Sequence, residues 1–245
     1  MEGVDGMNLL QDMICQSNRI VFFGGAGVST ESGIPDFRGE DGLYHQKYDY
    51  PPETIISHHF FMENPKEFYR FYQEKMLFLS AKPNPAHLKL AEMERKGKLC
   101  CVITQNIDGL HQAAGSKKVL ELHGSVLRNY CMKCRKSYPV ETIVDAPDIP
   151  LCTCGGMIKP DVVLYEESLD SQVLKSSIEA IQRADMLIVG GTSLNVYPAA
   201  GLIDYYNGNR LVLINKTPTP YDKRADLIIP DSIGKVLGNL TIESV

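Results

Sequence analysis

Four cysteines occur as two close pairs, a pattern typical of metal ligands. Two residues separate Cys131 from Cys134, one separates Cys152 from Cys154, and seventeen lie between the pairs. Two thiolate pairs at this separation fit a tetrahedral structural Zn²⁺ site. With all four ligands supplied by the chain, the ion would staple the fold and take no part in catalysis. A disulfide pair is the alternative if the protein resides in an oxidising compartment.

A glycine-rich run follows the apolar stretch Ile20–Phe23. Residues 24–39 read GGAGVSTESGIPDFRG. Glycines allow tight turns and close approach to a ligand, and the small residues Ala26 and Ser29 leave room for a phosphate at a helix N-terminus. The run does not match G-x-G-x-x-G, and no acidic residue closes a second strand about 20 positions on, as the usual dinucleotide fingerprint expects. It is therefore either a ligand loop or a plain strand-to-helix turn.

Amide and carboxylate side chains follow the apolar stretch Leu99–Thr104. The segment reads TQNIDGLH and brings Gln105, Asn106 and Asp108 to the end of the predicted strand. Ligands of open α/β sheets bind at the carboxyl ends of strands. An amide pair can hold ribose hydroxyls or a catalytic water, and Asp108 can accept a carboxamide N–H. An Asx turn that caps a helix is an alternative, and it is compatible with a binding role.

Three further positions follow strand-like stretches. His123, in ELHGS, is the side-chain type best suited to moving protons near neutral pH, although a lone histidine is often structural. The segment Gly190–Pro198 reads GGTSLNVYP and offers hydroxyls and close backbone approach to a phosphate or ribose. Asn215 ends another apolar stretch, where it is placed to contact an adenosine ribose.

The elements that position these residues indicate a doubly wound α/β sheet. Apolar runs typical of buried parallel strands occupy Ile20–Phe23, Leu99–Thr104, Met186–Gly190 and Leu211–Asn215, with weaker ones at Val119–Leu122 and Asp226–Ile229. Helical patterns occupy Pro85–Lys96, which ends before a C′ glycine at Gly97, Ser171–Ala184 and Ala199–Asn207. Alternating strands and helices predict this architecture.

Two segments interrupt the alternation. Asp41–Ala81 is rich in aromatic residues, His and Pro and predicts a small helical insertion. Tyr130–Pro160 carries the cysteine pairs and few periodic runs, which predicts a metal-stapled insertion.

Composition excludes several classes of partner. The net charge of −5 argues against a nucleic-acid surface. No stretch approaches the roughly 20 apolar residues that a membrane span needs. The acidic start lacks the basic-then-apolar pattern of a signal peptide. We expect a cytoplasmic protein with no nucleic-acid or membrane partner.

In their order along the chain, the motifs resemble those of the sirtuins, the NAD-dependent protein deacylases. The matching elements are GAGVSTESGIPDFRG, TQNID, HG and GTSLNVYP, with the cysteine pairs between HG and GTS. The resemblance covers essentially the whole chain. It implies one catalytic domain over 1–245, of the bacterial single-domain type. Its large Rossmann-like part would comprise about 1–40, 82–128 and 160–245, and its small part a helical insertion at about 41–81 and a zinc module at about 129–159.

The resemblance also implies a residue for each role. NAD and an acetyl-lysine peptide would enter the cleft between the two parts from opposite sides. His123 would be the general base, with Asn106 as a second catalytic residue. The implied NAD contacts are Gly25, Ala26, Gly27, Thr30, Phe37, Arg38, Gln105, Ile107, Asp108, Thr192, Ser193, Asn215 and Ile233. The peptide would pair as a strand with Val163 and Tyr165 on one side and Leu194, Asn195 and Val196 on the other.

The implied reaction consumes NAD as a co-substrate, alongside one structural Zn²⁺. The acyl oxygen attacks the ribose as nicotinamide leaves, and His123 then deprotonates a ribose hydroxyl. The products are nicotinamide, free lysine and acetylated ADP-ribose. We expect a monomer acting on acetyl-lysine proteins or peptides. The alternatives are a mono-ADP-ribosyltransferase that uses the same site and a non-catalytic module that binds NAD or ADP-ribose.

Three positions depart from the family pattern. Gly24 stands where the family has Thr, which we expect to loosen the start of the loop. Glu166 replaces the glycine of V-x-F-G-E, which we expect to alter peptide docking and to favour basic flanking residues. Tyr72 stands where relatives that remove acidic acyl groups carry Arg. No cation is then positioned for a malonyl or succinyl carboxylate unless Arg70 swings across, so we expect acetyl or longer neutral acyl groups.

Overall fold

The computed structural model describes residues 2–36 and 50–243, with side chains from residue 6 onwards. Within these residues, parallel strands form one sheet of six: β1 (Ile20–Gly24), β2 (Leu99–Thr104), β3 (Val119–Glu121), β7 (Met186–Gly190), β8 (Leu211–Ile214) and β9 (Leu227–Ile229). Their spatial order is β3-β2-β1-β7-β8-β9. When the six strands are numbered along the chain, this order is 3-2-1-4-5-6, which is the order of dinucleotide-binding sheets. In such sheets the ligand crevice opens where the strand order reverses, which is here between β1 and β7.

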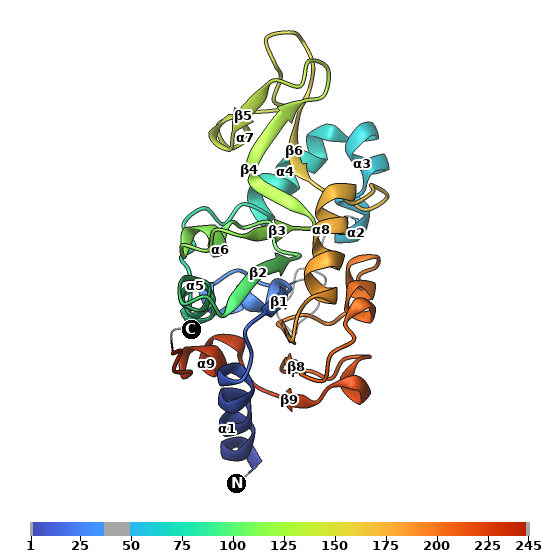
Figure 1. Ribbon diagram of the computed structural model, residues 1–245. Helices are drawn as coiled ribbons and strands as arrows, with labels where there is room; N and C mark the ends of the chain where they lie inside the picture. The colour runs from blue at the N-terminus through green and yellow to red at the C-terminus, as the bar shows by residue number, and fades with distance from the viewer. Residues whose placement is uncertain (1, 37–49, 244–245) are drawn as a thin grey trace.

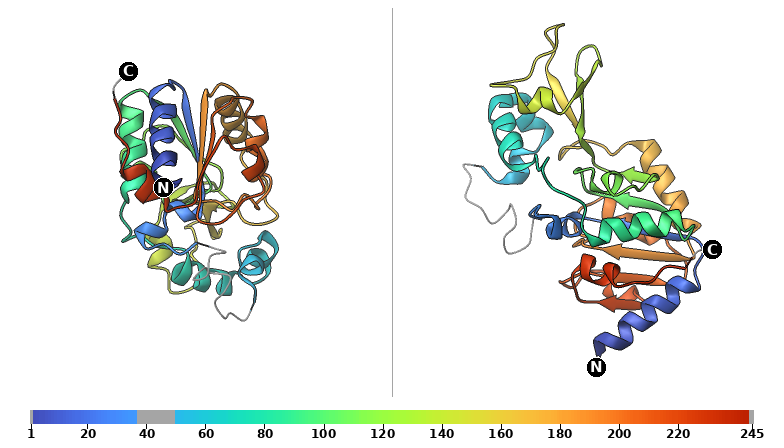
Figure 2. Two further views of the ribbon diagram at one scale, coloured as in Figure 1. Left: turned by 90° about the horizontal axis from the view of Figure 1, so that it is seen from below. Right: turned by 90° about the vertical axis from the view of Figure 1, so that its left-hand side faces the viewer.

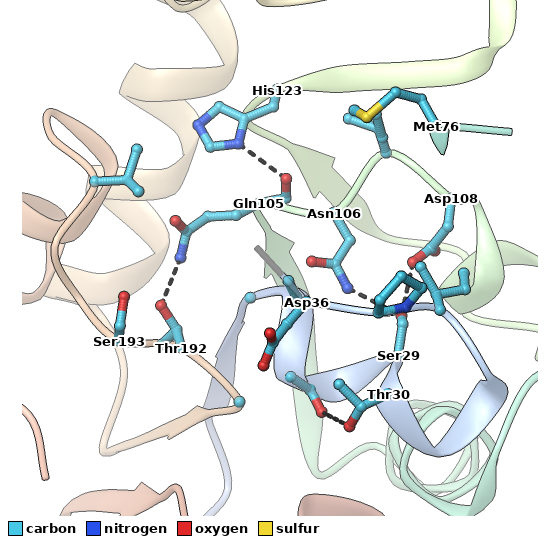
Figure 3. Close-up of a pocket in the computed structure, with 18 of the residues that line it drawn as sticks. Ser29, Thr30, Asp36, Met76, Gln105, Asn106, Asp108, His123, Thr192 and Ser193 are labelled. Carbon is cyan, nitrogen blue, oxygen red and sulfur yellow. Dashed lines mark hydrogen bonds between the residues drawn. The ribbon is translucent and has the colours of Figure 1, made fainter. Parts of the chain in front are cut away.

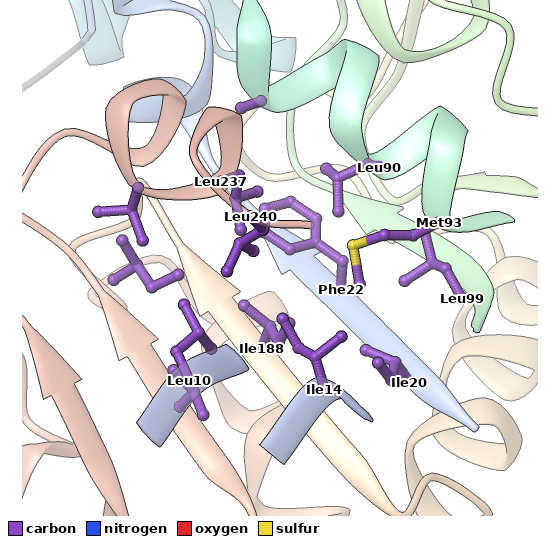
Figure 4. Packing of buried hydrophobic residues seen from close by; sticks show 14 of the residues in the cluster. Leu10, Ile14, Ile20, Phe22, Leu90, Met93, Leu99, Ile188, Leu237 and Leu240 are labelled. Atoms are coloured by element: carbon purple, nitrogen blue, oxygen red, sulfur yellow. The ribbon is translucent and has the colours of Figure 1, made fainter. Parts of the chain in front are cut away.

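Helices cover both faces of this sheet (Figure 2). One face carries α1 (Glu2–Cys15), α5 (Pro85–Arg95) and α9 (Ile233–Gly238), and the other carries α8 (Ser171–Gln182) and the 3₁₀ helix η4 (Ala199–Tyr205). Along β1, Ile20 and Phe22 pack into the first core, whereas Val21 and Phe23 pack into the second. Figure 4 shows the first core, where side chains of α1, α5 and α9 meet the strands. Burial on both faces explains why these strands are continuously apolar.

Local signals in the sequence fix the ends of α5. Asn84 caps its start, accepting from the Ala86 amide at 2.9 Å, and Pro85 follows as the first helical residue. At the other end Gly97 adopts φ 78°, its amide donates to the Glu94 carbonyl, and the Lys98 amide donates to the Met93 carbonyl, both at 3.0 Å. This Schellman motif confirms Gly97 as the C′ glycine.

A second, smaller unit lies beyond the β3 edge of the sheet (Figure 1). Its antiparallel strands are β4 (Gly124–Cys131), β5 (Ser137–Pro139) and β6 (Ile158–Val162), in the order β5-β4-β6. Its helices are α2 (Pro52–Ile55), α3 (His58–Glu63), α4 (Pro65–Lys75) and α7 (Glu141–Val144). The two insertions share one apolar core, and the Tyr69 hydroxyl on α4 donates to the Ile158 carbonyl on β6 at 2.6 Å.

The remaining short elements lie near the glycine-rich run and on the outer loops. They are the 3₁₀ helices η1 (Ala26–Val28), η2 (Thr30–Ser32) and η5 (Asp222–Arg224), and the helix α6 (Leu110–Ala113). No helix within residues 2–36 and 50–243 has the length and apolar character needed to cross a membrane.

The predicted fold class is confirmed, with each of the six predicted strands in place. Pro85–Lys96 and Ser171–Ala184 contain the observed α5 and α8, while Ala199–Asn207 forms a 3₁₀ helix instead of an α-helix. The helix α7 of the small unit was not predicted, and neither were two helices of the large unit, α1 and α9. Both carry an i, i+3, i+4 apolar pattern, Leu10, Met13 and Ile14 in α1 and Ile233, Val236 and Leu237 in α9, all buried.

Candidate active site

A cavity of about 940 Å³ opens at the carboxyl ends of β1, β2, β7 and β8 and extends to the small unit. Figure 3 shows part of its lining. The structure brings together in this lining most residues predicted for the site: Gly25, Ala26, Gly27, Thr30, Gln105, Asn106, Ile107, Asp108, His123, Val163, Tyr165, Thr192, Ser193, Val196, Asn215 and Ile233. Phe37 and Arg38 lie outside the described residues. Leu194 and Asn195 are absent from the lining.

Two glycine turns lock together at the reversal of strand order. The Gly27 amide donates to the Gly191 carbonyl at 2.8 Å. A Cβ added to Gly27 would lie 2.8 Å from the Gly191 Cα, and one added to Gly25 would lie 2.7 Å from the Thr192 Cβ. Gly191 itself adopts φ 58°. The loops that follow β1 and β7 can approach this closely only because these positions are glycines, and the result is a backbone cradle suited to a pyrophosphate.

Gly24 is the last residue of β1 and pairs with both Thr104 and Gly190. A Cβ there would lie 2.7 Å from the Phe22 ring. The expectation that Gly24 loosens the start of the loop is therefore wrong, since the residue is a regular part of the central strand and tightly packed.

A hydrogen-bonded group of three side chains joins the glycine-rich run to the loop after β2. The Ser29 hydroxyl donates to Asp108 Oδ2 at 2.6 Å and accepts from Asn106 Nδ2 at 3.0 Å (Figure 3). Asp108 Oδ1 accepts from the Leu110 amide at 2.8 Å, so the Asx turn expected here is present as well. Each of the three side chains fixes the orientation of the other two. Asn106 Oδ1 takes no part in these hydrogen bonds. Sequence reasoning treated Ser29 only as a small residue and missed its central place in the group.

Gln105 connects the loop after β2 to two other parts of the site. Its Nε2 donates to Thr192 Oγ1 at 3.1 Å, across to the loop after β7. Its backbone carbonyl lies 2.9 Å from His123 Nδ1 (Figure 3). Its own amide donates to the Gly24 carbonyl at 2.9 Å, which holds the residue against the end of β1.

The contacts of His123 define its protonation state. A carbonyl oxygen can only accept, so Nδ1 carries the proton in the bond to Gln105 and Nε2 holds a free lone pair. Burial lowers the pKa of His123 below its ordinary value, against an opposing effect of the Gln105 hydrogen bond. The ring is therefore neutral near pH 7 and able to accept a proton at Nε2.

The far end of the cavity holds Asn215 and Ile233. Asn215 Nδ2 donates to the Thr217 carbonyl at 2.7 Å, which orients its side chain. The Glu31 carboxylate accepts from the Gly234 amide at 2.6 Å and so ties η2 to α9. Lys216 and Asp231 also line this end, and the sequence analysis did not identify them. The signal available for Lys216 was its position directly after Asn215 at the end of β8.

The wall opposite the strand ends consists of two segments. Residues 163–167, called here the docking segment, run beside residues 56–58, and Tyr165 exchanges backbone hydrogen bonds with Ile56 and His58. Val196 and Tyr197 line the facing side. The Leu194 side chain is instead 1% exposed within the second core, with φ 56°, and Asn195 faces outward. The Leu194 side chain therefore does not reach the cavity, and the Leu194 amide donates to Thr192 Oγ1 at 3.3 Å.

The four paired cysteines converge in the small unit. Their Sγ atoms all lie within 4.8 Å of one another, with Cys131–Cys154 at 3.5 Å and Cys134–Cys152 at 3.6 Å. A tetrahedral Zn²⁺ with bonds of about 2.3 Å sets sulfur–sulfur separations of about 3.8 Å, so the donor set fits this ion. The Cys154 amide and the Tyr138 hydroxyl, 3.0 Å from the sulfur, lower the pKa of Cys152 to about 5. Against an opposing hydrogen bond from the Gly156 amide, the neighbouring cysteine side chains raise the pKa of Cys154 to about 11.

The fold and the cavity thus define an α/β protein of the dinucleotide-binding type, with a neutral histidine in the cavity and a four-cysteine cluster in the small unit. The model of the Sir2 family matches residues 25–198. This chain belongs to the Sir2 family.

Individual relatives match almost the full length. An NAD-dependent protein deacetylase of Clostridium acetobutylicum is 60% identical over 238 residues, which is 96% of this chain and 97% of that protein. A Sir2 structure with a deacetylated p53 peptide and 3′-O-acetyl-ADP-ribose has a TM-score of 0.87 at 44% identity, covering 94% of this chain and 95% of that one. A Sir2 structure with a p53 peptide and NAD⁺ has a TM-score of 0.84 at 43% identity, with the same coverage.

Proposed function

We propose that this chain is an NAD-dependent protein lysine deacetylase. It transfers the acetyl group of acetyl-lysine to ADP-ribose and releases nicotinamide and free lysine. The observation that carries the proposal is the presence, in one cavity, of a neutral histidine with a free Nε2 and the hydrogen-bonded group of Ser29, Asn106 and Asp108. The name of the 60% identical relative and the acetyl-ADP-ribose in a structural neighbour support it.

Under this proposal NAD lies along the ends of the strands. The backbone of Gly25, Ala26 and Gly27 would hold the pyrophosphate, with Thr30, Thr192 and Ser193 beside it. Asn215 and Ile233 would hold the adenosine half. Phe37 and Arg38 keep their expected roles at the phosphate and nicotinamide regions as part of the proposal. The close glycine contacts are compatible with this assignment, since they bring the backbones of the loops after β1 and β7 together at this wall of the cavity.

Gln105, Asn106, Ile107 and Asp108 would hold nicotinamide and its ribose. The Asp108 carboxylate suits the carboxamide N–H of nicotinamide, and the fixed Asn106 amide suits a ribose hydroxyl or water. Cleavage of the nicotinamide bond passes through an oxocarbenium-like transition state, so these residues would exclude water and fix the attack geometry of the acetyl oxygen.

His123 would act next as the general base. Its Nε2 would accept the proton of a ribose hydroxyl. The oxygen of this hydroxyl then attacks the former carbonyl carbon of the acetyl group, whose own oxygen is by then bonded to the ribose. Nδ1 would stay bonded to the Gln105 carbonyl, which stabilises the ring in one orientation as it becomes charged. Water then completes the release of lysine and acetylated ADP-ribose.

The peptide would lie between the docking segment and residues 194–196. Val163, Tyr165, Leu194, Asn195 and Val196 are the residues proposed to pair with it, through the backbone in the manner of an added strand. The core position of the Leu194 side chain supports a backbone role there.

One Zn²⁺ bound by Cys131, Cys134, Cys152 and Cys154 would supply a structural crosslink when present. The four thiolates leave it no open position for substrate or water, so no catalytic step passes through it.

Neither alternative activity is favoured. A mono-ADP-ribosyltransferase would leave the adenine label of NAD on protein, and a sensing module would bind NAD without releasing nicotinamide. Simple binding requires neither Asp108 nor a neutral His123. We further propose a monomeric, cytoplasmic enzyme without a nucleic-acid or membrane partner. The net charge and the free, unbridged cysteines support this assignment.

The deciding experiment incubates the protein with an acetyl-lysine peptide and NAD. We expect nicotinamide, deacetylated peptide and acetyl-ADP-ribose in equal molar amounts, measured by mass spectrometry and chromatography. Deacetylation that continues without NAD, or adenine label retained on protein, would contradict the proposal.

A further inference from the structure

Glu166 and Glu167 are neighbours in the docking segment but have different partners. Glu167 Oε2 accepts from Lys159 Nζ and from the Leu164 amide, both at 3.0 Å, and Oε1 lies 2.9 Å from His58 Nδ1. The Lys159 side chain is only 4% exposed, and its Nζ also donates to the Val162 carbonyl. The charge of Glu167 is thus balanced inside the protein, where it holds the segment in shape.

Glu166 is exposed, and its carboxylate is held by an uncharged group. Its Oε2 accepts from the His59 amide at 2.9 Å, at the start of α3. The two histidines at the start of α3 have other acidic partners, His58 with Glu167 and His59 with Glu63 at 3.1 Å. No ion pair found among residues 2–36 and 50–243 includes Glu166. Its negative charge is therefore held in place by the His59 amide, and no cation of the described residues balances it.

The backbone places this charge beside the path of the substrate. The Tyr165 amide donates to the Ile56 carbonyl, and the Tyr165 carbonyl accepts from the His58 amide. These two bonds anchor the docking segment to the helical insertion. Glu166 follows with φ 74°, a left-handed conformation that turns the chain, and it lines the same cavity as Val196 and Tyr197. A peptide that occupies the space between these walls passes the Glu166 carboxylate.

We propose that Glu166 is a specificity-determining residue that selects acetyl-lysine peptides with a basic residue next to the modified lysine. The proposal rests on the deacetylase function proposed above and names the class of peptide that this site prefers. A fixed carboxylate attracts a Lys or Arg side chain and repels an acidic one. Exposed ion pairs of this kind change an equilibrium by about 1.5- to 5-fold, and added salt screens them.

The test uses three acetyl-lysine peptides that differ only in the flanking residue, Arg, Ala or Glu. For each we measure kcat/KM by nicotinamide release and, separately, Kd by fluorescence anisotropy of the labelled peptide. The native protein should prefer Arg over Ala by about two- to fivefold and disfavour Glu, with the preference shrinking at 0.5 M salt. The peptide KM should carry this difference, with kcat alike for the three peptides.

Glu166→Gln is the informative variant, because it removes the charge and keeps an oxygen for the His59 amide. We expect the ratio of Arg to Ala peptides to fall to about 1. Glu63→Gln is the matched control: it removes one exposed carboxylate from α3, away from the cavity, and should keep the native ratio. Glu167→Gln should raise KM for all three peptides alike, since it loosens the whole segment.

An unchanged ratio in Glu166→Gln, or a native protein indifferent to the flanking residue, would overturn the inference. The binding measurement separates this outcome from failure of the proposed function. If no peptide is deacetylated, the function is wrong, while a charge preference in Kd that disappears in Glu166→Gln still supports the role of Glu166.

Discussion

The cofactor half of the cavity and its peptide half are constructed by different means. At the strand ends, side chains bond to one another: Ser29 joins Asn106 and Asp108, and Gln105 joins Thr192 and His123. The peptide half consists of two segments whose backbones turn through left-handed residues and whose exposed groups include Glu166. Side-chain identity therefore fixes the chemistry, whereas backbone shape and a few exposed charges set peptide recognition.

The largest expected effect comes from removing the base of the cofactor half. His123→Ala should lower kcat by about 100- to 10,000-fold, the usual contribution of general acid–base catalysis, because no second histidine is among the described residues of the lining. NAD affinity, measured by calorimetry, should stay close to native, since the glycine cradle is untouched. Equal losses of NAD affinity and kcat would instead indicate that His123 supports the fold of this half.

A second effect concerns the packing beneath the cofactor half. His87 and His111 are buried with ring centroids 4.7 Å apart. Burial lowers the pKa of His87 to about 4 and that of His111 to about 3, so both are neutral in the folded protein. The unfolded chain has ordinary values near 6.5 and binds protons that the folded chain excludes. The free energy of unfolding should therefore fall as pH drops below about 6.5, by about 1.4 kcal/mol per pH unit for each ring.

Urea denaturation at pH 7, 6 and 5 measures this slope. His111→Leu removes one of the two rings and should lessen the pH dependence in this range. The same slope in the variant would show that other groups cause it.

The smallest effect tests the close contact of the glycine turns. Gly27→Ala places a methyl group 2.8 Å from the Gly191 Cα, and since both sides are backbone, the loops must separate at a cost of about 1–3 kcal/mol. NAD affinity should fall with it. Gly6→Ala makes the same change within α1, where the nearest atom is 4.0 Å away, and should stabilise by about 0.5–1 kcal/mol. Thermal unfolding and NAD titration compare the two, and a Gly27→Ala protein with native NAD affinity would show that the cradle does not hold the pyrophosphate.

The same contrast explains what the sequence could predict. Strands such as Leu99–Thr104 were recognisable because burial on both faces makes them continuously apolar, and the polar residues at their ends followed from sheet topology. Residue types alone thus indicated His123 and Asp108. The bond from Ser29 to Asp108 spans 79 positions, and no local pattern reports it.

The peptide half was less predictable for a different reason. Leu194 and Glu166 adopt left-handed backbone conformations that tertiary contacts impose. Neither Leu nor Glu favours such a conformation, so the sequence gives no signal for it. The inward turn of the Leu194 side chain could not be read from GTSLNVYP for the same reason. The helices α1 and α9, by contrast, carried a readable apolar spacing.

The core shared by the two insertions has a consequence for the order of events on the ribosome. The Tyr69 hydroxyl on α4 finds its partner, the Ile158 carbonyl, 89 positions later. Gln73 Nε2 likewise donates to the Ile143 and Ala146 carbonyls, which are synthesised about 70 positions later. At about 5–20 residues per second, the helical insertion stays without its partner surface for roughly 4–18 s of synthesis. During that interval Phe61 and Phe68 have no strands to cover them, so the nascent chain exposes its most aromatic segment until the zinc module has emerged.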